Sequence, residues 1–257
     1  MLQSIYSSLT REAEACPGFY APVERVCIGQ VWTLVQVKGQ TGLCMTPQSY
    51  SRTLSWSGEL CGRPASELIG WLDSWQPFET TLAVAALNAV LRGGADYTDM
   101  MAASKTLGGG NLAVFRAMRE QLGNGKISVI GRYPGLDDVL EGLDYVCIER
   151  NPTEKDLPDQ AAEAVLPQSR WAFITASALA NRTLPRLLQL CSEPTTLLMG
   201  PSLLWSRLWF DQGCDYLAGV EVVDADRLWK TAMEGGGVRI FQGAVGYRLL
   251  SRDGQKG

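Results

Sequence analysis

The chain has 257 residues, enough for one large domain or for two smaller domains that each bury a core. Hydrophobic residues make up 46% and charged residues 19%, which is the composition of an ordinary soluble globular protein. The formal net charge of −4 argues against nucleic acid or an anionic membrane as a partner held by bulk electrostatics.

The beginning of the chain lacks the features of a secretory leader, because Arg11, Glu12 and Glu14 interrupt it before a long apolar stretch forms. The longest apolar run, residues 82–91, is broken by Asn88 and is too short to cross a membrane. We therefore expect a cytoplasmic protein with no membrane partner.

Histidine is absent from the sequence, which removes the usual general base near neutral pH and a common ligand of borderline metals. Catalysis by a Ser-His-Asp or Cys-His arrangement is thereby excluded. The seven cysteines stand singly, without a C-x-x-C pair, and are most simply core thiols in a reducing compartment. Direct chelation by Cys, Asp and Glu is disfavoured, because soft-metal sites usually bring their ligands in clusters.

The first half of the chain predicts a small α+β unit. Residues 2–15 have the spacing of an amphipathic helix. Three strand-like runs of an antiparallel meander follow, over residues 24–29, 31–37 and 41–46. A helix is expected from Pro77 to about residue 91. Residues 95–110 have no strong periodicity and predict a connecting loop, before a helix that Asn111 caps.

From residue 126 the pattern changes to short apolar runs that alternate with helices. The runs cover residues 127–131, 145–149, 171–175, 196–200 and 216–219. Such runs are typical of buried parallel strands in a doubly wound sheet. Residues 238–241 and 247–250 predict an edge hairpin. The expected fold class is α/β, with a small α+β domain over 1–123 and a Rossmann-like, mostly parallel sheet over 124–257.

Ligands of an open α/β sheet bind at the carboxyl ends of its strands, and this rule selects the candidate site. The candidates are Gly131, Arg132, Tyr133 and Pro134 after the first strand, Glu149 after the second, Thr175, Ser177, Asn181 and Thr183 after the third, and Gly200, Pro201 and Ser202 after the fourth. The same residue types also suit a structural role, since glycines form tight turns and hydroxyls cap helices.

The loop of residues 131–135 resembles an anion-binding turn that precedes a helix, although its G-x-x-x-G spacing is not the dinucleotide-binding G-x-G-x-x-G. Glu149 lies 18 residues after Gly131, close to the spacing at which an acidic residue binds a ribose. One hypothesis is therefore an enzyme that uses a nucleotide-type cofactor in the Rossmann crevice.

Six segments together carry a broader pattern. They are residues 26–46, 82–89, 162–167, 174–184, 200–202 and 217–224, with ITASALANRTL at 174–184 and LAGVEVVD at 217–224. They resemble a bacterial and archaeal family described as "putative heavy-metal chelatases". The resemblance implies an amino-terminal domain like that of enolase, a Rossmann-like domain, and a site in the cleft between them.

Two positions depart from the family's pattern. Its first Rossmann loop usually reads Gly-His-Phe-Pro, whereas residues 131–134 read Gly-Arg-Tyr-Pro, and its Thr-Gly after the third strand is Thr175-Ala176 here. Arg132 in place of histidine disfavours a metal ligand and favours an anion, because a guanidinium pairs with carboxylate or phosphate.

The leading hypothesis is a protein that binds a small anionic ligand or a metal complex in this cleft. Arg132, the loop of residues 131–135 and the Asn181 and Thr183 pair would hold the ligand. A role in heavy-metal chelation or handling, with a divalent heavy metal or a metal complex as the bound group, is what the resemblance implies. A protein with a purely structural role remains an alternative, and the sequence decides neither a reaction nor whether the chain forms a homo-oligomer.

Overall fold

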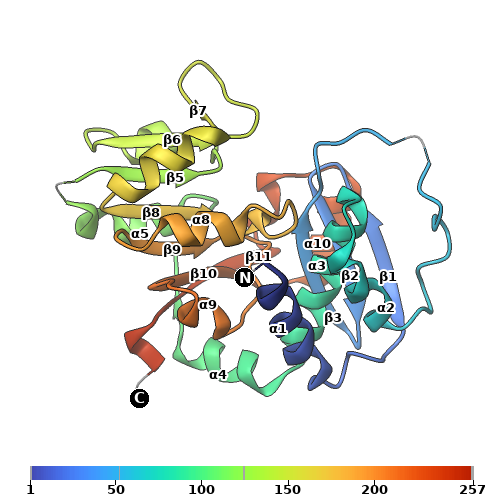
Figure 1. Ribbon diagram of the computed structural model, residues 1–257. Helices are drawn as coiled ribbons and strands as arrows, with labels where there is room; N and C mark the ends of the chain where they lie inside the picture. The colour runs from blue at the N-terminus through green and yellow to red at the C-terminus, as the bar shows by residue number, and fades with distance from the viewer. Residues whose placement is uncertain (1, 52, 124, 256–257) are drawn as a thin grey trace.

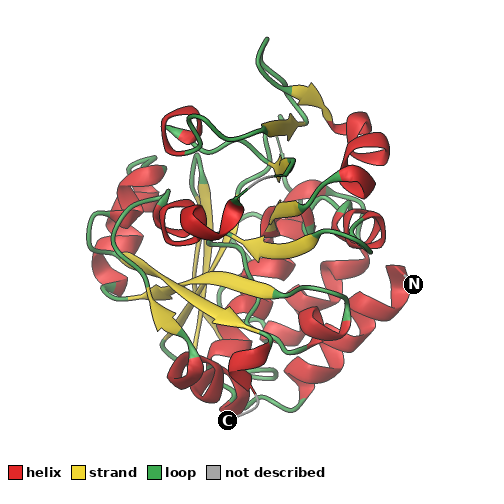
Figure 2. Ribbon diagram, turned by 90° about the vertical axis from the view of Figure 1, so that its left-hand side faces the viewer, coloured by secondary structure: helices red, strands yellow, loops and turns green. Residues whose placement is uncertain are grey.

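The computed structural model describes residues 2–51, 53–123 and 125–255, which form two packed α/β units (Figure 1). Figure 2 shows strands crossing the middle of the molecule with helices on both sides of them. Among the described residues, no helix is both long and apolar enough to span a membrane.

The amino-terminal unit begins with helix α1 (Leu2–Glu14) and contains a three-stranded antiparallel sheet in the order β1-β2-β3. Its strands are β1 (Val23–Ile28), β2 (Trp32–Val37) and β3 (Gln40–Met45). Helix α3 (Pro77–Arg92) packs on this sheet, and helix α2 (Ala65–Gly70) packs against α3. A Cβ atom on Gly42 would lie 2.1 Å from the Ala85 carbonyl oxygen, so glycine at this position lets α3 lie directly on β3.

The carboxy-terminal unit contains an eight-stranded sheet in the order β4-β11-β10-β9-β8-β5-β6-β7. Its strands are β4 (Lys105–Thr106), β5 (Ile127–Ile130), β6 (Tyr145–Glu149), β7 (Leu157–Pro158), β8 (Trp171–Thr175), β9 (Thr195–Met199), β10 (Tyr216–Val222) and β11 (Val245–Ser251). Strands β5 to β10 run parallel, while β11 is antiparallel to both β10 and β4. The predicted Rossmann-like, mostly parallel sheet is therefore confirmed.

The sheet reverses its direction of growth between β5 and β8. From β5 the chain adds β6 and β7 on one side, and it then returns to place β8, β9 and β10 on the other. The chain leaves the carboxyl ends of β5 and β8 in opposite directions, and this leaves a crevice between the two strand ends. Ligands of doubly wound folds bind in such a crevice.

The helices of this unit are short, and three of them have only four residues each. Its helices are α5 (Ala113–Leu122), α6 (Leu136–Val139), α7 (Ala162–Val165), α8 (Leu184–Leu190), α9 (Leu208–Asp211) and α10 (Ala225–Met233). The prediction that Asn111 caps α5 is wrong, since Leu112 is the N-cap and the Asn111 side chain donates to the Pro134 carbonyl oxygen.

Two expectations about irregular segments are also wrong. Residues 95–110, expected to be a connecting loop, contain helix α4 (Ala95–Ala103) and strand β4. Only Met100 of α4 is buried, so its sequence carries little apolar periodicity to detect. The expected edge hairpin is absent from the described residues, because Val238–Phe241 forms a 3₁₀ turn (η5) and β11 lies inside the sheet.

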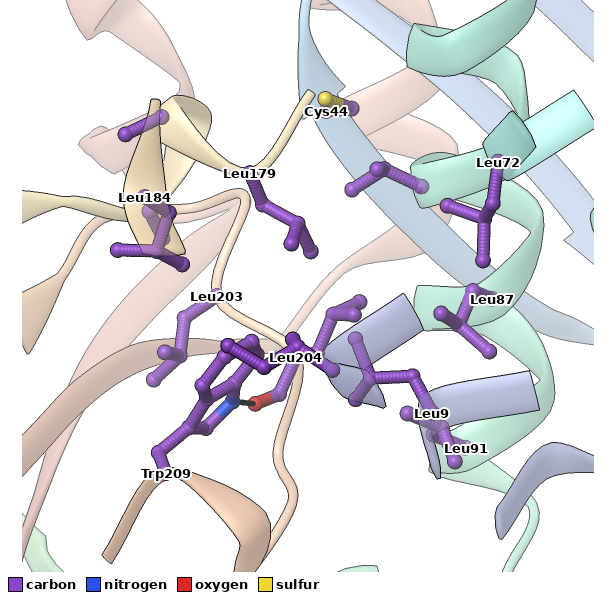
Figure 3. Close-up of a cluster of buried hydrophobic side chains, with 14 of the residues drawn as sticks. Leu9, Cys44, Leu72, Leu87, Leu91, Leu179, Leu184, Leu203, Leu204 and Trp209 are labelled. Carbon is purple, nitrogen blue, oxygen red and sulfur yellow. Dashed lines mark hydrogen bonds between the residues drawn. The ribbon is translucent and has the colours of Figure 1, made fainter. Parts of the chain in front are cut away.

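The two units share one hydrophobic core. Leu9, Leu87 and Leu91 of the amino-terminal unit lie in the same cluster as Leu203 and Trp209 of the other unit (Figure 3). Because side chains in a shared core are closely packed, this core holds the two units in one relative position. The cleft between them is consequently a feature of a rigid frame.

A buried polar contact adds to this shared core. The side-chain amide of Asn88, in α3, donates to the Leu43 carbonyl oxygen at 3.3 Å and to the Leu203 carbonyl oxygen at 3.0 Å. Arg92, one turn later, donates to Asn88 Oδ1 at 2.7 Å and to the Val220 carbonyl oxygen at 2.8 Å. Asn88 and Arg92 therefore tie both units together through backbone carbonyls that would otherwise lack partners.

Candidate functional site

A cavity of about 1170 Å³ lies between the two units at the carboxyl ends of β5, β6, β8 and β9. Every candidate residue that the sequence selected at these strand ends lines it. The volume is that of a site for a small organic molecule or a metal complex. The rule that places ligands at strand ends thus brings together residues from four separate segments of the chain.

Apolar side chains form much of the cavity wall. They come from both units and include Trp32, Met45, Ile130, Ile148, Leu187, Phe241 and Tyr247. Polar and charged lining residues come from the strand ends of the large sheet, such as Glu149 and Thr175, and also from the amino-terminal unit, such as Gln48 and Thr81. A wall of this kind suits a ligand with a sizeable apolar surface and a few polar groups.

Arg132 lies at the cavity but is already paired with two carboxylates. Its Nε donates to Asp156 Oδ1 at 2.5 Å and its Nη1 donates to Asp137 Oδ1 at 2.9 Å. The Asp156 side chain has no exposed surface, and the Arg132 side chain is 22% exposed. The guanidinium therefore presents little uncompensated charge to a ligand.

The Arg132 network has a clear effect on its carboxyl groups. Hydrogen bonds from Tyr145, Arg132 and Lys155 hold the pKa of Asp137 far below its usual value. Burial raises the pKa of Asp156, but hydrogen bonds from Thr153 and Arg132 outweigh burial and leave it lowered. Both groups are thus carboxylates at neutral pH, and their role is to hold Arg132 and the loop that follows β6.

Glu149 also has structural partners. One carboxylate oxygen accepts from the Arg132 backbone amide at 2.8 Å, and the other accepts from the Arg150 backbone amide at 2.8 Å. The side chain thereby joins the loops that follow β5 and β6. Since helix α6 has only four residues, this end of the sheet also lacks the long helix of a dinucleotide-binding unit.

The other arginines around the cavity are engaged as well. Arg186 forms an ion pair with Glu163, and Arg150 lies 3.6 Å from Asp159. The Arg182 guanidinium donates to the backbone carbonyl oxygens of Leu72 and Ser74. The cavity lining is therefore close to electrically neutral and does not form a cationic pocket.

Three of the remaining candidates form local or interdomain hydrogen bonds. The Asn181 side chain accepts from the Thr183 hydroxyl at 2.6 Å and from the Thr183 amide at 3.1 Å, which fixes the turn before α8. The Ser202 hydroxyl accepts from the Met45 amide at 2.9 Å and so joins the two units. These three side chains therefore form hydrogen bonds that stabilise the protein itself.

Tyr133 and Thr175 are different, because they leave hydrogen-bonding capacity at the floor of the cavity. The Tyr133 ring packs edge-on against Phe115, and its buried hydroxyl lies near Thr175 but forms no hydrogen bond of normal geometry with the described residues. Burial raises the pKa of this hydroxyl, which keeps it protonated. The Thr175 and Ser177 hydroxyls lie 2.9 Å apart, close to the positive-φ glycines Gly131 and Gly200.

The described residues do not fit a directly bound heavy metal. They include no group of three or more Cys, Asp or Glu side chains placed to hold a metal ion, and the sequence has no histidine. Cys147, the cysteine nearest to Arg132 in this region, is 2% exposed, and burial raises its pKa to about 12. Because the thiolate is the metal-binding form of cysteine, Cys147 is a poor ligand at neutral pH.

The sequence analysis missed the cavity residues that come from outside the large sheet's strand ends. These are chiefly Trp32, residues 45–49, Asn111, Gly237, Val238 and Phe241. They lie in loops or on strand ends whose sequence shows no motif. The family resemblance, which implied a cleft between the two domains, was the only signal for this side of the cavity.

Two family models match the chain. DUF364, described as "Putative heavy-metal chelation", matches residues 113–251, and DUF4213, with the same description, matches residues 16–91. No curated protein matches.

Two solved structures share the fold over almost the whole chain. A protein of unknown function from Desulfitobacterium hafniense has 23% identity and a TM-score of 0.82, with 98% of each chain covered. A protein of unknown function from Pyrococcus horikoshii has 22% identity and a TM-score of 0.77, with 98% of this chain and 100% of that one covered. Both are described as DUF364 proteins. Since the DUF364 model matches more than half of the residues, the chain belongs to the DUF364 family of "Putative heavy-metal chelation" proteins.

Proposed function

We propose that this protein binds a small molecule or a metal complex in the cavity between its two units. The observation that carries the proposal is the position of that cavity, at the β5 and β8 ends where the sheet changes direction. Both units line the cavity, and the core that they share keeps it preformed. A preformed apolar cavity with a few polar groups is the usual form of a ligand site.

The charge distribution narrows the class of ligand. Arg132, Arg150 and Arg186 are each paired with a carboxylate, and Arg182 donates to carbonyl oxygens, so a small multiply charged anion would have to compete with existing partners of these arginines. A ligand that is neutral or carries a single negative charge fits better. The anion-binding role of Arg132 stays a prediction, and its pairing with Asp137 and Asp156 favours a role in holding the cavity's rim.

The family description concerns heavy metals, and the residues that line the cavity determine whether a metal would bind directly or within a complex. With no preformed cluster of three metal-ligating side chains among the described residues, the metal would arrive inside a complex whose own donors coordinate it. The protein would then contact the organic part of that complex. Among the roles that the family description allows, these residues fit the binding of a heavy metal that is already chelated by another molecule.

Thermal unfolding against a ligand panel tests the proposal. The panel contains divalent metal ions, metal complexes including metallated tetrapyrroles, oxyanions, nucleotides and S-adenosylmethionine. A ligand that binds only the folded state adds about 2.7 kcal/mol of stability at one hundred times its dissociation constant. We expect a shift with an organic ligand or a metal complex, and none with free metal ions.

A matched pair of variants places the binding site. Val238 lines the cavity and is 47% exposed, whereas Val223 lies outside it and is 68% exposed. Tryptophan at Val238 fills part of the cavity and should weaken binding, while tryptophan at Val223 should not. Equal shifts for both variants, or no shift with any panel member, would contradict the proposal.

A further inference from the structure

The cavity floor beside Gly200 is surrounded by hydroxyl groups. A Cβ atom built on Gly200 would lie 3.8 Å from the Tyr133 hydroxyl oxygen and 3.9 Å from Thr175 Oγ1. Gly200 has a φ of 120° and no side chain, so this space stays open. The hydroxyls of Tyr133 and Thr175, which come from the loop after β5 and the end of β8, therefore converge on one point of the floor.

A count of hydrogens shows that this floor can donate. The Tyr133 hydroxyl forms no hydrogen bond of normal geometry with a described residue, although it lies close enough to Thr175 for the two side chains to interact. In the Thr175 and Ser177 pair, one hydroxyl donates to the other across 2.9 Å. Even with Tyr133 and Thr175 bonded to each other, three hydroxyls joined in a row use two hydrogens, so at least one hydrogen remains for a ligand. A buried hydroxyl without a partner costs about 1–3 kcal/mol, so a ligand that accepts from it recovers that cost.

The donors at this floor carry no charge. Arg132, the nearest arginine along the chain, is directed to Asp156 and Asp137 and is compensated by them. Neutral donors bind a carbonyl oxygen or a singly charged carboxylate well. They are less suited to a phosphate dianion, which is usually held by arginine, lysine or a long helix.

We propose that the ligand carries a carboxylate or carbonyl group whose oxygen accepts hydrogen bonds from the Tyr133 hydroxyl and from the Thr175 and Ser177 pair. This inference rests on the proposed function, because it names the polar group of the molecule that fills the same cavity. The floor then orients the ligand, and the apolar wall formed by Trp32, Phe241 and their neighbours contacts its remainder.

Three small probes test the inference by titration of ¹⁵N-labelled protein. Acetate presents a carboxylate, acetamide presents a neutral carbonyl, and inorganic phosphate is the comparison anion. We expect acetate and acetamide to shift the backbone amide signals of Gly131, Thr175 and Gly200, and phosphate to shift them less at equal concentration.

The Tyr133→Phe variant removes the hydroxyl and keeps the ring that packs on Phe115. Its apparent dissociation constant should rise about tenfold for acetate and about threefold for acetamide, because hydrogen bonds to charged groups are the stronger ones. Ser177→Ala should act in the same direction. Tyr97→Phe is the control, since the Tyr97 hydroxyl accepts from Arg92 outside the cavity.

A folding artefact is separable from lost binding. Since the Tyr133 hydroxyl forms no protein hydrogen bond of normal geometry, Tyr133→Phe should be about as stable as wild type without ligand. One outcome would overturn the inference alone. In it, Val238→Trp weakens the binding of panel ligands, but Tyr133→Phe and Ser177→Ala bind acetate and acetamide as tightly as wild type does. The proposed function would then still hold. If no panel ligand and no probe binds in the cavity, both fail.

Discussion

Replacement of Asp156 by asparagine tests the view that Arg132 belongs to the frame of the site. The Asp156 carboxylate accepts from Arg132 Nε at 2.5 Å, from the Thr153 amide at 2.9 Å and from the Thr153 hydroxyl at 2.6 Å. Asparagine has nearly the same shape but only one accepting oxygen, so it cannot serve both residues. Either Arg132 or Thr153 must then face an amide group that donates.

The expected loss of stability follows from burial. Breaking a fully buried ion pair costs about 3–5 kcal/mol. Because the Arg132 side chain is 22% exposed and keeps Asp137 as a partner, we expect about 2–3 kcal/mol for Asp156→Asn. The control is Asp159→Asn, three residues along the chain, where the pair with Arg150 spans 3.6 Å and both side chains are at least 40% exposed. This control should lose less than about 1 kcal/mol.

Urea unfolding of wild type and both variants measures these losses, provided that the dependence on urea concentration is unchanged. Asp156→Asn should also bind inorganic phosphate more tightly than wild type, because Arg132 loses one of its compensating charges. A loss below about 1 kcal/mol, or equal losses for Asp156→Asn and Asp159→Asn, would refute the assignment of Arg132 to a buried structural pair.

Three further predictions concern the frame around the cavity. Asn88→Ala removes hydrogen bonds to Leu43, Leu203 and Arg92, and should destabilise the protein by about 2–4 kcal/mol in urea unfolding; a loss below 1 kcal/mol would contradict the interdomain tie. Gly42→Ala places a Cβ atom against the backbone of α3 and should reduce the yield of folded protein, whereas Gly70→Ala, in an open helical position, should leave the unfolding temperature unchanged or raised. The stability should also depend on pH. Because the pKa of Asp156 is lowered in the folded protein, this carboxylate stabilises the fold above about pH 5, and that stabilisation is lost as the pH falls below 4. Because burial raises the pKa of Cys44 to about 12, the contribution of this thiol is present below about pH 8 and is lost as the pH rises. Urea unfolding between pH 3 and pH 10 should therefore show a stability maximum between these limits, and a flat profile would contradict it.

The inner strands of the large sheet could be predicted because they are short apolar runs that are largely buried on both faces, whereas β4 and β7 have only two exposed residues each and lack this pattern. Strands β5, β6, β8 and β9 show this directly, and their carboxyl ends identified one side of the cavity. Helix α4 could not be predicted, since a helix that buries only Met100 has almost no apolar stripe.

The partners of individual site residues lay beyond the sequence. Asp156 follows Arg132 by 24 positions, and nothing in the spacing indicates that the two side chains meet. Only the parallel pairing of β5 with β6 brings their following loops together. The same holds for Tyr133, whose lack of a hydrogen bond of normal geometry depends on the packing of Phe115 and the glycine at position 200.

A crystal structure of the protein with the ligand that gives the largest thermal shift tests the central claim most directly. We expect the ligand between the two units, in contact with Gly131, Thr175 and Gly200 at the floor and with Trp32 on the opposite wall. A ligand bound elsewhere, such as in the smaller cavity of about 330 Å³ beside Arg92 and Tyr97, with the large cavity free of it, would contradict the account.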